Sequence, residues 1–192
     1  MAKTIIGLVG EDPNDTDSIR NLISSNFPNV QFNPLLKRLN GSQLETPKAK
    51  KMLKVEYQDQ QPKAVVFIRD LDGVRTEKAK VQKREEYFDT CNAVVDGRGL
   101  PLLNIYTLEA LIYAEIGTFN SEYGAKVKFK GDPTMIENPK EKLKSQTAKG
   151  QRKYHESHNP SLFSKLNYNT VQENCSYFSQ FIGELENKIK QK

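Results

Sequence analysis

The chain has 192 residues, with 29 Lys and Arg against 24 Asp and Glu, which gives a formal net charge of +5. This length accommodates about one domain, and no apolar run approaches the length that crosses a bilayer, so we expect no membrane partner. The mild positive charge is compatible with a nucleic acid, a phosphorylated ligand or simple solubility. The two cysteines, Cys91 and Cys175, lie far apart in the sequence, which favours reduced thiols and a cytoplasmic protein.

The first part of the chain alternates apolar, strand-like runs with helical patterns. The runs occupy residues 4–10, 30–36, 63–69 and 100–106. A helical pattern follows each run: one capped by Asn14 or Asp15, one capped by Thr46 and extending to about residue 58, one over 74–90 and one over 107–115. This alternation predicts an α/β fold in which a mostly parallel, Rossmann-like sheet has helices on both faces.

After residue 117 the pattern changes. Residues 125–130 alternate Val and Phe with Lys, which predicts a half-exposed edge strand, and residues 131–160 form a polar, basic loop region. A capping box of Thr170 and Glu173 then predicts one long C-terminal helix, whose apolar stripe is expected to pack on the core. We therefore expect a core over 1–118 and a C-terminal extension over 119–192, joined in one globular unit.

Acidic residues follow three of the four predicted strands. These acids are Glu11 and Asp12 after the first strand, Asp70 and Asp72 after the third, and Glu109 after the fourth. Because parallel strands direct their carboxyl ends to one edge of the sheet, the fold would bring these acids together. Clustered carboxylates repel one another unless protons or a cation neutralise them, and Mg²⁺ accepts such oxygen ligands. The same acids also fit a structural role, because Asp favours turns and helix caps.

Two segments, GLVGEDPNDTDSIRNLI (residues 7–23) and AVVFIRDLDG (residues 64–73), resemble the Toprim domain, the metal-binding module of topoisomerases, primases and OLD-type nucleases. The resemblance covers about residues 4–116. It implies that Glu11, Asp70 and Asp72 hold Mg²⁺ or Mn²⁺ during phosphodiester chemistry. Toprim glutamates are usually followed by Gly, whereas Asp12 follows Glu11 here, so Asp12 is the alternative ligand at this position.

The segment TLEALIYAE (residues 107–115) and the tail are similar to those of small bacterial proteins with Toprim-like cores that are related to OLD-type nucleases. This similarity implies that Glu109 joins the metal site. It also suggests Lys165 as a cation that stabilises charge on phosphate oxygens. An ATPase partner and a role in bacterial or phage defence are implied by the same resemblance.

The leading interpretation is a metal-dependent nuclease or nickase that acts on DNA or RNA. Two lysine-rich segments, 37–54 and 139–153, would attract its phosphate backbone. One alternative is a non-catalytic module that binds nucleic acid or protein, and another is a receiver-like phosphorelay domain, for which Thr107 is present but a matching lysine strand is lacking. His155 and His158 lie in a polar loop, so we expect surface histidines rather than metal ligands.

Overall fold

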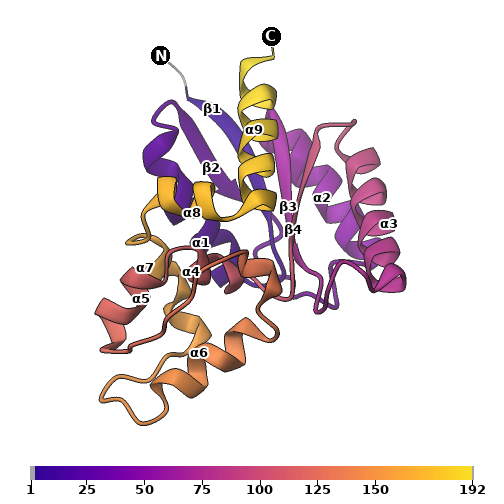
Figure 1. The fold of residues 1–192 in the computed structure, drawn as a ribbon. Helices are drawn as coiled ribbons and strands as arrows, with labels where there is room; N and C mark the ends of the chain where they lie inside the picture. Colours follow the sequence, from indigo (N-terminus) through magenta and orange to yellow (C-terminus); the bar gives the residue numbers. More distant parts are fainter. Residues whose placement is uncertain (1–2, 192) are drawn as a thin grey trace.

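The computed structural model describes residues 3–191, and at its centre lies a four-stranded sheet with strand order β2-β1-β3-β4 (Figure 1). All three neighbouring pairs are parallel, which confirms the predicted fold class. The two central strands are almost entirely buried, as expected for strands covered on both faces. The strands are β1 (Thr4–Val9), β2 (Val30–Pro34), β3 (Ala64–Asp70) and β4 (Gly99–Asn104).

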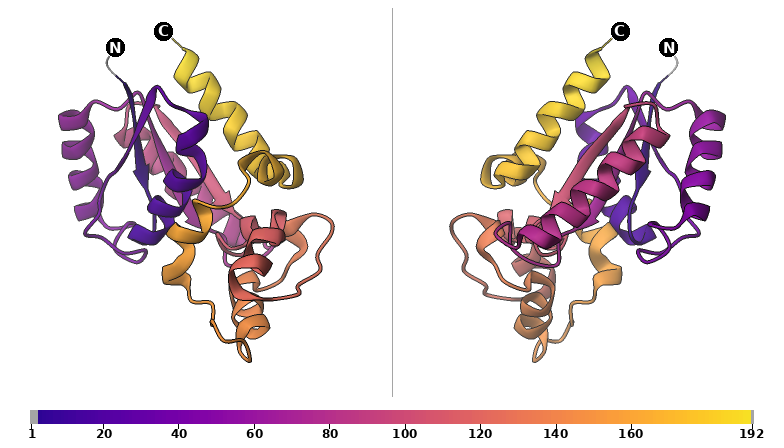
Figure 2. Two further views of the ribbon diagram at one scale, coloured as in Figure 1. Left: turned by 90° about the vertical axis from the view of Figure 1, so that its left-hand side faces the viewer. Right: turned by 90° about the vertical axis from the view of Figure 1, so that its right-hand side faces the viewer.

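Helices cover both faces of the sheet (Figure 2). Alternate strand residues enter the two layers: Leu8 and Val66 belong to one core cluster, and Val9 and Phe67 belong to the other. The covering helices are α1 (Pro13–Ile23) and α9 (Ser176–Lys190) on the first side, and α2 (Pro47–Gln60) and α3 (Lys78–Val94) on the second. Within residues 3–191, none of the helices combines the length and apolar character of a membrane span.

Helix starts follow the capping chemistry of the sequence, with one correction. Thr46 caps α2 as predicted, because its hydroxyl accepts the Ala49 N–H at 3.2 Å. The cap of α1, however, is Asp12 rather than Asn14 or Asp15. The Asp12 carboxylate accepts the Asn14 N–H at 2.8 Å, and the Asp15 carboxylate accepts the Asp12 N–H at 3.0 Å. This capping box holds two acids at the start of the first helix.

Most of the rest of the chain gathers beyond the carboxyl ends of the strands, in the lower part of Figure 1, whereas residues 168–174 lie higher, beside the start of α9. The predicted helix over 107–115 is shorter than expected, and a further helix spans the predicted boundary at residue 118. The elements here are α4 (Ala110–Ala114), α5 (Ile116–Tyr123), α6 (Pro139–Thr147), α7 (Asn159–Phe163) and α8 (Tyr168–Asn174). Short 3₁₀ turns occupy Ser24–Asn26, Pro133–Met135 and Glu156–His158.

Three predictions for the C-terminal extension are wrong. Residues 125–130 form no strand, because the Asn120 side chain bonds both backbone groups of Val127, at 2.9 Å each. The basic segment expected as a loop contains helix α6. The long C-terminal helix is broken at Cys175, which has an extended backbone, and Asn167 rather than Thr170 caps its first part, α8.

Candidate functional site

A cavity of about 450 Å³ lies at the carboxyl edge of the sheet, between the strand ends and the C-terminal extension. Acids line its core side: Glu11, Asp12, Asp15, Asp70 and Glu109. We call it the acid cavity. Its opposite side is lined by Lys140, His155, Glu156, Ser157 and Asn159. The structure thus brings together the predicted residues Glu11, Asp70 and Glu109, with Asp12 beside them.

The parallel topology explains why acids that are distant in sequence converge. Asp70 is the last residue of β3, and Glu11 follows the neighbouring strand β1 by two residues. Glu109 immediately precedes α4, after β4 on the other side of β3. In the sequence Asp15 was considered only as a cap of the first helix. Its side chain lines the cavity because the capping box turns it back toward Asp12.

Two carboxyl groups of the acid cavity are electrostatically strained. Burial raises the pKa of Asp70 well above its usual value, and the negative charges of Asp15, Glu109 and Glu11 raise it further; a hydrogen bond from Asn104 Nδ2, at 3.0 Å, acts in the opposite direction. Burial, together with the neighbouring acids, raises the pKa of Asp15 from 3.8 to about 7. Both groups therefore gain from a proton or a cation.

Glu11 already has a cationic neighbour. Arg69, with only 3% of its side chain exposed, places Nε 2.9 Å from Glu11 Oε1. The Nε–H is not aligned as a hydrogen bond, so the contact is an ion pair. The Asp70 N–H also donates to Glu11 Oε1, at 3.3 Å. The second oxygen, Oε2, lies against Gly41, where a Cβ atom would approach it to 2.8 Å.

Asp72 does not line the acid cavity, in contrast to the prediction. Its backbone is left-handed, with φ 56°, and 63% of its side chain is exposed. Its carboxylate instead pairs with Arg84 at 3.3 Å, and Arg84 also donates to the Asp70 carbonyl oxygen at 2.8 Å. The left-handed turn is the physical reason that the two acids of the D-x-D motif separate.

Glu109 is fixed by neutral donors. The residue is 3% exposed, and its Oε1 accepts from Tyr154 at 3.2 Å and from Asn159 at 3.0 Å, whereas Oε2 accepts from Thr107 at 2.6 Å. Burial and the negative Glu109 raise the pKa of the Tyr154 hydroxyl, so it stays a donor. Glu109 thus ties the C-terminal extension to the core.

The predicted cation, Lys165, lies elsewhere. Its Nζ pairs with Glu122 at 2.7 Å, and this contact lowers the pKa of the Glu122 carboxyl. The cation that does line the acid cavity is Lys140, together with His155. The sequence predicts a surface histidine at position 155 because it lies in a polar loop with no Cys or Glu-rich helix nearby, and His155 is exposed in the structure. Only the folded extension places it opposite the acids.

A comparison with protein-family profiles matches residues 11–186 to a domain of unknown function, DUF4276. The chain belongs to the DUF4276 family. The match covers both the core and the extension, and therefore every residue that lines the acid cavity. Comparisons with curated proteins and with solved structures gave no match.

The carboxylates of the acid cavity in this DUF4276 chain suit a hard divalent cation, because carboxylate oxygens are the ligands that Mg²⁺ and Mn²⁺ prefer. Within residues 3–191, however, no three His, Cys, Asp or Glu side chains are already grouped around one metal position. Asp70, Asp15 and the Oε2 atom of Glu11 are the groups that would hold a cation. Their side chains would have to rotate toward a common point.

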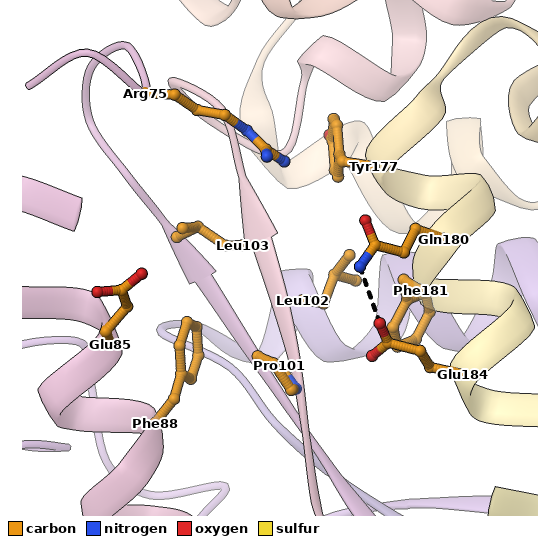
Figure 3. Close-up of a pocket in the computed structure, with 10 residues that line it drawn as sticks. All are labelled: Arg75, Glu85, Phe88, Pro101, Leu102, Leu103, Tyr177, Gln180, Phe181 and Glu184. Atoms are coloured by element: carbon orange, nitrogen blue, oxygen red, sulfur yellow. Dashed lines mark hydrogen bonds between the residues drawn. The ribbon is translucent and has the colours of Figure 1, made fainter. Parts of the chain in front are cut away.

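A second cavity, of about 310 Å³, lies along the edge strand β4 of the DUF4276 chain, between α3 and α9 (Figure 3). The two acids that line this cavity lie on opposite sides of the strand, Glu85 on α3 and Glu184 on α9. The Gln180 side-chain amide donates a hydrogen bond to Glu184 at 2.9 Å. Pro101 removes a backbone donor from the outer edge of β4. This cavity gathers no acid cluster, and the acid cavity remains the candidate site.

Proposed function

We propose that the chain hydrolyses phosphodiester bonds of nucleic acid with Mg²⁺ or Mn²⁺, as a nuclease or nickase. The observation that carries the proposal is the acid cavity, where Asp70 and Asp15 have raised pKa values beside Glu11 and Glu109. Such a concentration of buried negative charge is what a divalent cation relieves. The resemblance of residues 7–23 and 64–73 to the Toprim domain supports the same chemistry.

In this proposal the chain's own residues have distinct roles. Asp70 and Glu11 bind the cation, Asp15 supplements them, and Glu109 positions the wall formed by Tyr154 and Asn159. A divalent ion held here would neutralise charge on a phosphate oxygen and acidify an attacking water. A partner ATPase, a role in bacterial defence and a cytoplasmic location belong to the same proposal. The first two rest on the resemblance to OLD-type nucleases, and the location rests on the two unpaired cysteines.

A non-catalytic binding module is the second candidate, and one observation favours it. Glu11 and Asp72 are both paired with arginines, as expected of acids with a structural role. The receiver-like interpretation has less support. No strand follows β4 within residues 3–191, and the Thr107 hydroxyl is bound to Glu109.

Titration calorimetry with MnCl₂ separates the two candidates. We expect stoichiometric binding by the wild type, loss of binding in Asp70→Asn, and unchanged binding in Asp89→Asn, an exposed acid on α3. Asp72→Asn tests whether the ion is held by the residues of the acid cavity or by the two acids of the D-x-D motif, Asp70 and Asp72. Binding should persist in this variant if the acid cavity holds the ion, and it should fail if both motif acids are ligands.

The catalytic half of the proposal needs a second assay. Supercoiled plasmid, single-stranded DNA and RNA are incubated with the protein and Mn²⁺, with EDTA as the blank. Loss of one charged group that acts on the transition state typically costs at least about 100-fold in rate. We therefore expect nicking that falls by that factor in Asp70→Asn but not in Asp89→Asn. A wild type that binds neither Mn²⁺ nor Mg²⁺ would leave only the binding module.

A further inference from the structure

The acid cavity has two chemically different sides. The acids come from the core, at the ends of β1 and β3 and the starts of α1 and α4. The opposite side comes from the C-terminal extension and carries hydrogen-bond donors, among them Lys140 at the start of α6 and His155 before the 3₁₀ turn Glu156–His158. A ligand between these sides would meet acids on one side. On the other it would meet donors together with Glu156, whose charge is paired with Lys144 at 2.8 Å.

The contacts of His155 determine which of its ring nitrogens is a donor. The backbone N–H of Ser157 lies 3.2 Å from His155 Nδ1 and can only donate, so Nδ1 accepts. The Ser157 hydroxyl oxygen lies 2.9 Å from the same nitrogen. In the neutral ring the hydrogen is therefore on Nε2, which is left to donate to a ligand.

The segment that carries His155 is held at both ends. Tyr154 precedes it and donates to Asn159 Oδ1 at 2.6 Å as well as to Glu109. Glu156 follows it and pairs with Lys144 of α6 at 2.8 Å. His155 is exposed and Lys140 is half-buried, so both are accessible to a ligand. The segment that carries His155 is thus preorganised relative to the acids.

We propose that Lys140 and His155 form the phosphate-binding side of the acid cavity, with His155 donating its Nε2 hydrogen to a non-bridging phosphate oxygen. This inference rests on the proposed function, because an anion enters a cavity lined by six acids only when a cation accompanies it. A phosphate group bridges the two sides, since its oxygens bind a divalent cation and accept from Lys and His together. The phosphate could belong to a nucleic-acid backbone or be free, and the test separates these sources.

The first test measures binding without cleavage. Anisotropy of a fluorescein-labelled 20-nucleotide DNA, single-stranded and duplex, is followed in CaCl₂, with inorganic phosphate as competitor. A hydrogen bond to a charged group contributes about 1.5–3 kcal/mol, so His155→Gln and Lys140→Gln should each weaken binding about 10-fold or more. Strong competition by millimolar phosphate would identify free phosphate as the ligand, and weak competition would identify the backbone.

Matched controls lie close to each residue. His158→Gln changes a histidine that does not line the cavity. Its Nδ1 atom lies 3.0 Å from the Tyr123 hydroxyl and accepts the His155 backbone N–H at 3.3 Å, and the amide oxygen of Gln keeps an acceptor for these donors. Lys142→Gln changes an exposed lysine on the same helix. We expect both controls to bind the DNA within about threefold of the wild type, with folding checked by thermal unfolding, because neither removes a donor from the cavity.

Three further readouts decide the outcome. Long-range ¹⁵N spectra should show hydrogen on Nε2 of His155, and the Nε2 resonance should move when the DNA is added. Mn²⁺ affinity should be unchanged in His155→Gln, because the residue binds the anion and not the metal. An Nδ1–H tautomer, or wild-type DNA affinity in both variants, would overturn the inference while leaving the Mn²⁺ and nicking results untouched. Conversely, the wild type could bind DNA through His155 and Lys140 without ever nicking it. That result would refute the proposed nuclease activity and leave the phosphate-binding inference standing.

Discussion

Asp15→Asn tests whether the acid cavity stores electrostatic strain in the metal-free protein. The pKa of Asp15 is raised from 3.8 to about 7, chiefly by burial. Each pKa unit corresponds to 1.36 kcal/mol, so ionised Asp15 destabilises the folded state by about 4 kcal/mol before solvent screening. Because the side chain keeps some contact with solvent, we expect the substitution to raise the free energy of unfolding by about 2 kcal/mol at pH 8. Asn keeps the acceptor that binds the Asp12 N–H, so the helix cap survives.

The sign of the pH dependence follows from the direction of the shift. A carboxyl group whose folded pKa is raised does not destabilise the fold below its unfolded pKa, near 4. Destabilisation grows as the pH rises from about 4 to about 7 and is constant above that range. The stability advantage of Asp15→Asn should therefore be small at pH 4, intermediate at pH 5.5 and largest at pH 8.

Urea unfolding in EDTA at these three pH values measures the advantage directly. Asp17→Asn is the matched control, because Asp17 lies on the same helix and pairs with Arg20 at 2.9 Å on the surface. Its effect should stay below about 1 kcal/mol at every pH. If Asp15→Asn were no more stable than the wild type at pH 8, or if its advantage did not grow with pH, the carboxylates would not be strained and the electrostatic argument for a cation would fail.

Three further substitutions test the contacts around the cavity. Gly41→Ala places a Cβ atom 2.8 Å from Glu11 Oε2, so the carboxylate has to move from its place in the cavity. Mn²⁺ affinity by calorimetry should therefore fall roughly tenfold, which corresponds to about 1.4 kcal/mol. Glu109→Gln replaces an acceptor oxygen with an amide donor, which then faces the donors Tyr154, Asn159 and Thr107. The free energy of unfolding in urea should therefore fall by about 1–3 kcal/mol. The control Glu137→Gln, at an exposed residue, should leave it unchanged. Arg69→Met removes the buried cation that pairs with Glu11 and Glu45, although Arg84 stays 3.9 Å and 3.2 Å from them, so it should cost about 1.5–3 kcal/mol of unfolding free energy. Surface Arg20→Met should cost less than about 1 kcal/mol.

The convergence of the acids at one edge could be predicted because it depends on topology alone. Once the strands are parallel, Glu11 and Asp70 lie at the same end of neighbouring strands whatever the loops do. The strands themselves were identifiable because buried parallel strands are apolar on both faces. Helix α2 was equally clear, since Thr46 and Pro47 supply both a cap and a favoured first residue.

The remainder depended on contacts that no local pattern encodes. Asp72-Gly73 indicated a turn, but the sequence did not show that Asp72 itself would take the left-handed position and so turn away from Asp70. Lys165 is directed by Glu122, which lies more than forty residues earlier in the chain. Likewise, residues 125–130 have the alternation of a strand, but the Asn120 side chain bonds the N–H and C=O of Val127, which a strand would share with its neighbour.

The two predicted ligands on neighbouring strands differ in how their charge is balanced, and this difference bears on how any loss of activity should be interpreted. Glu11 shares its Oε1 atom with Arg69, which is too deeply buried to leave, so Glu11 helps to keep the fold together even without a metal. Asp70 accepts from neutral Asn104, and its charge is opposed by burial and by the other acids. Removing the charge of Glu11 therefore takes away one of the two carboxylates that pair with buried Arg69 at 2.9 Å, whereas removing that of Asp70 relieves repulsion. Lost activity with raised stability identifies a residue kept for its ligand, and we expect Asp70→Asn, but not Glu11→Gln, to show both effects.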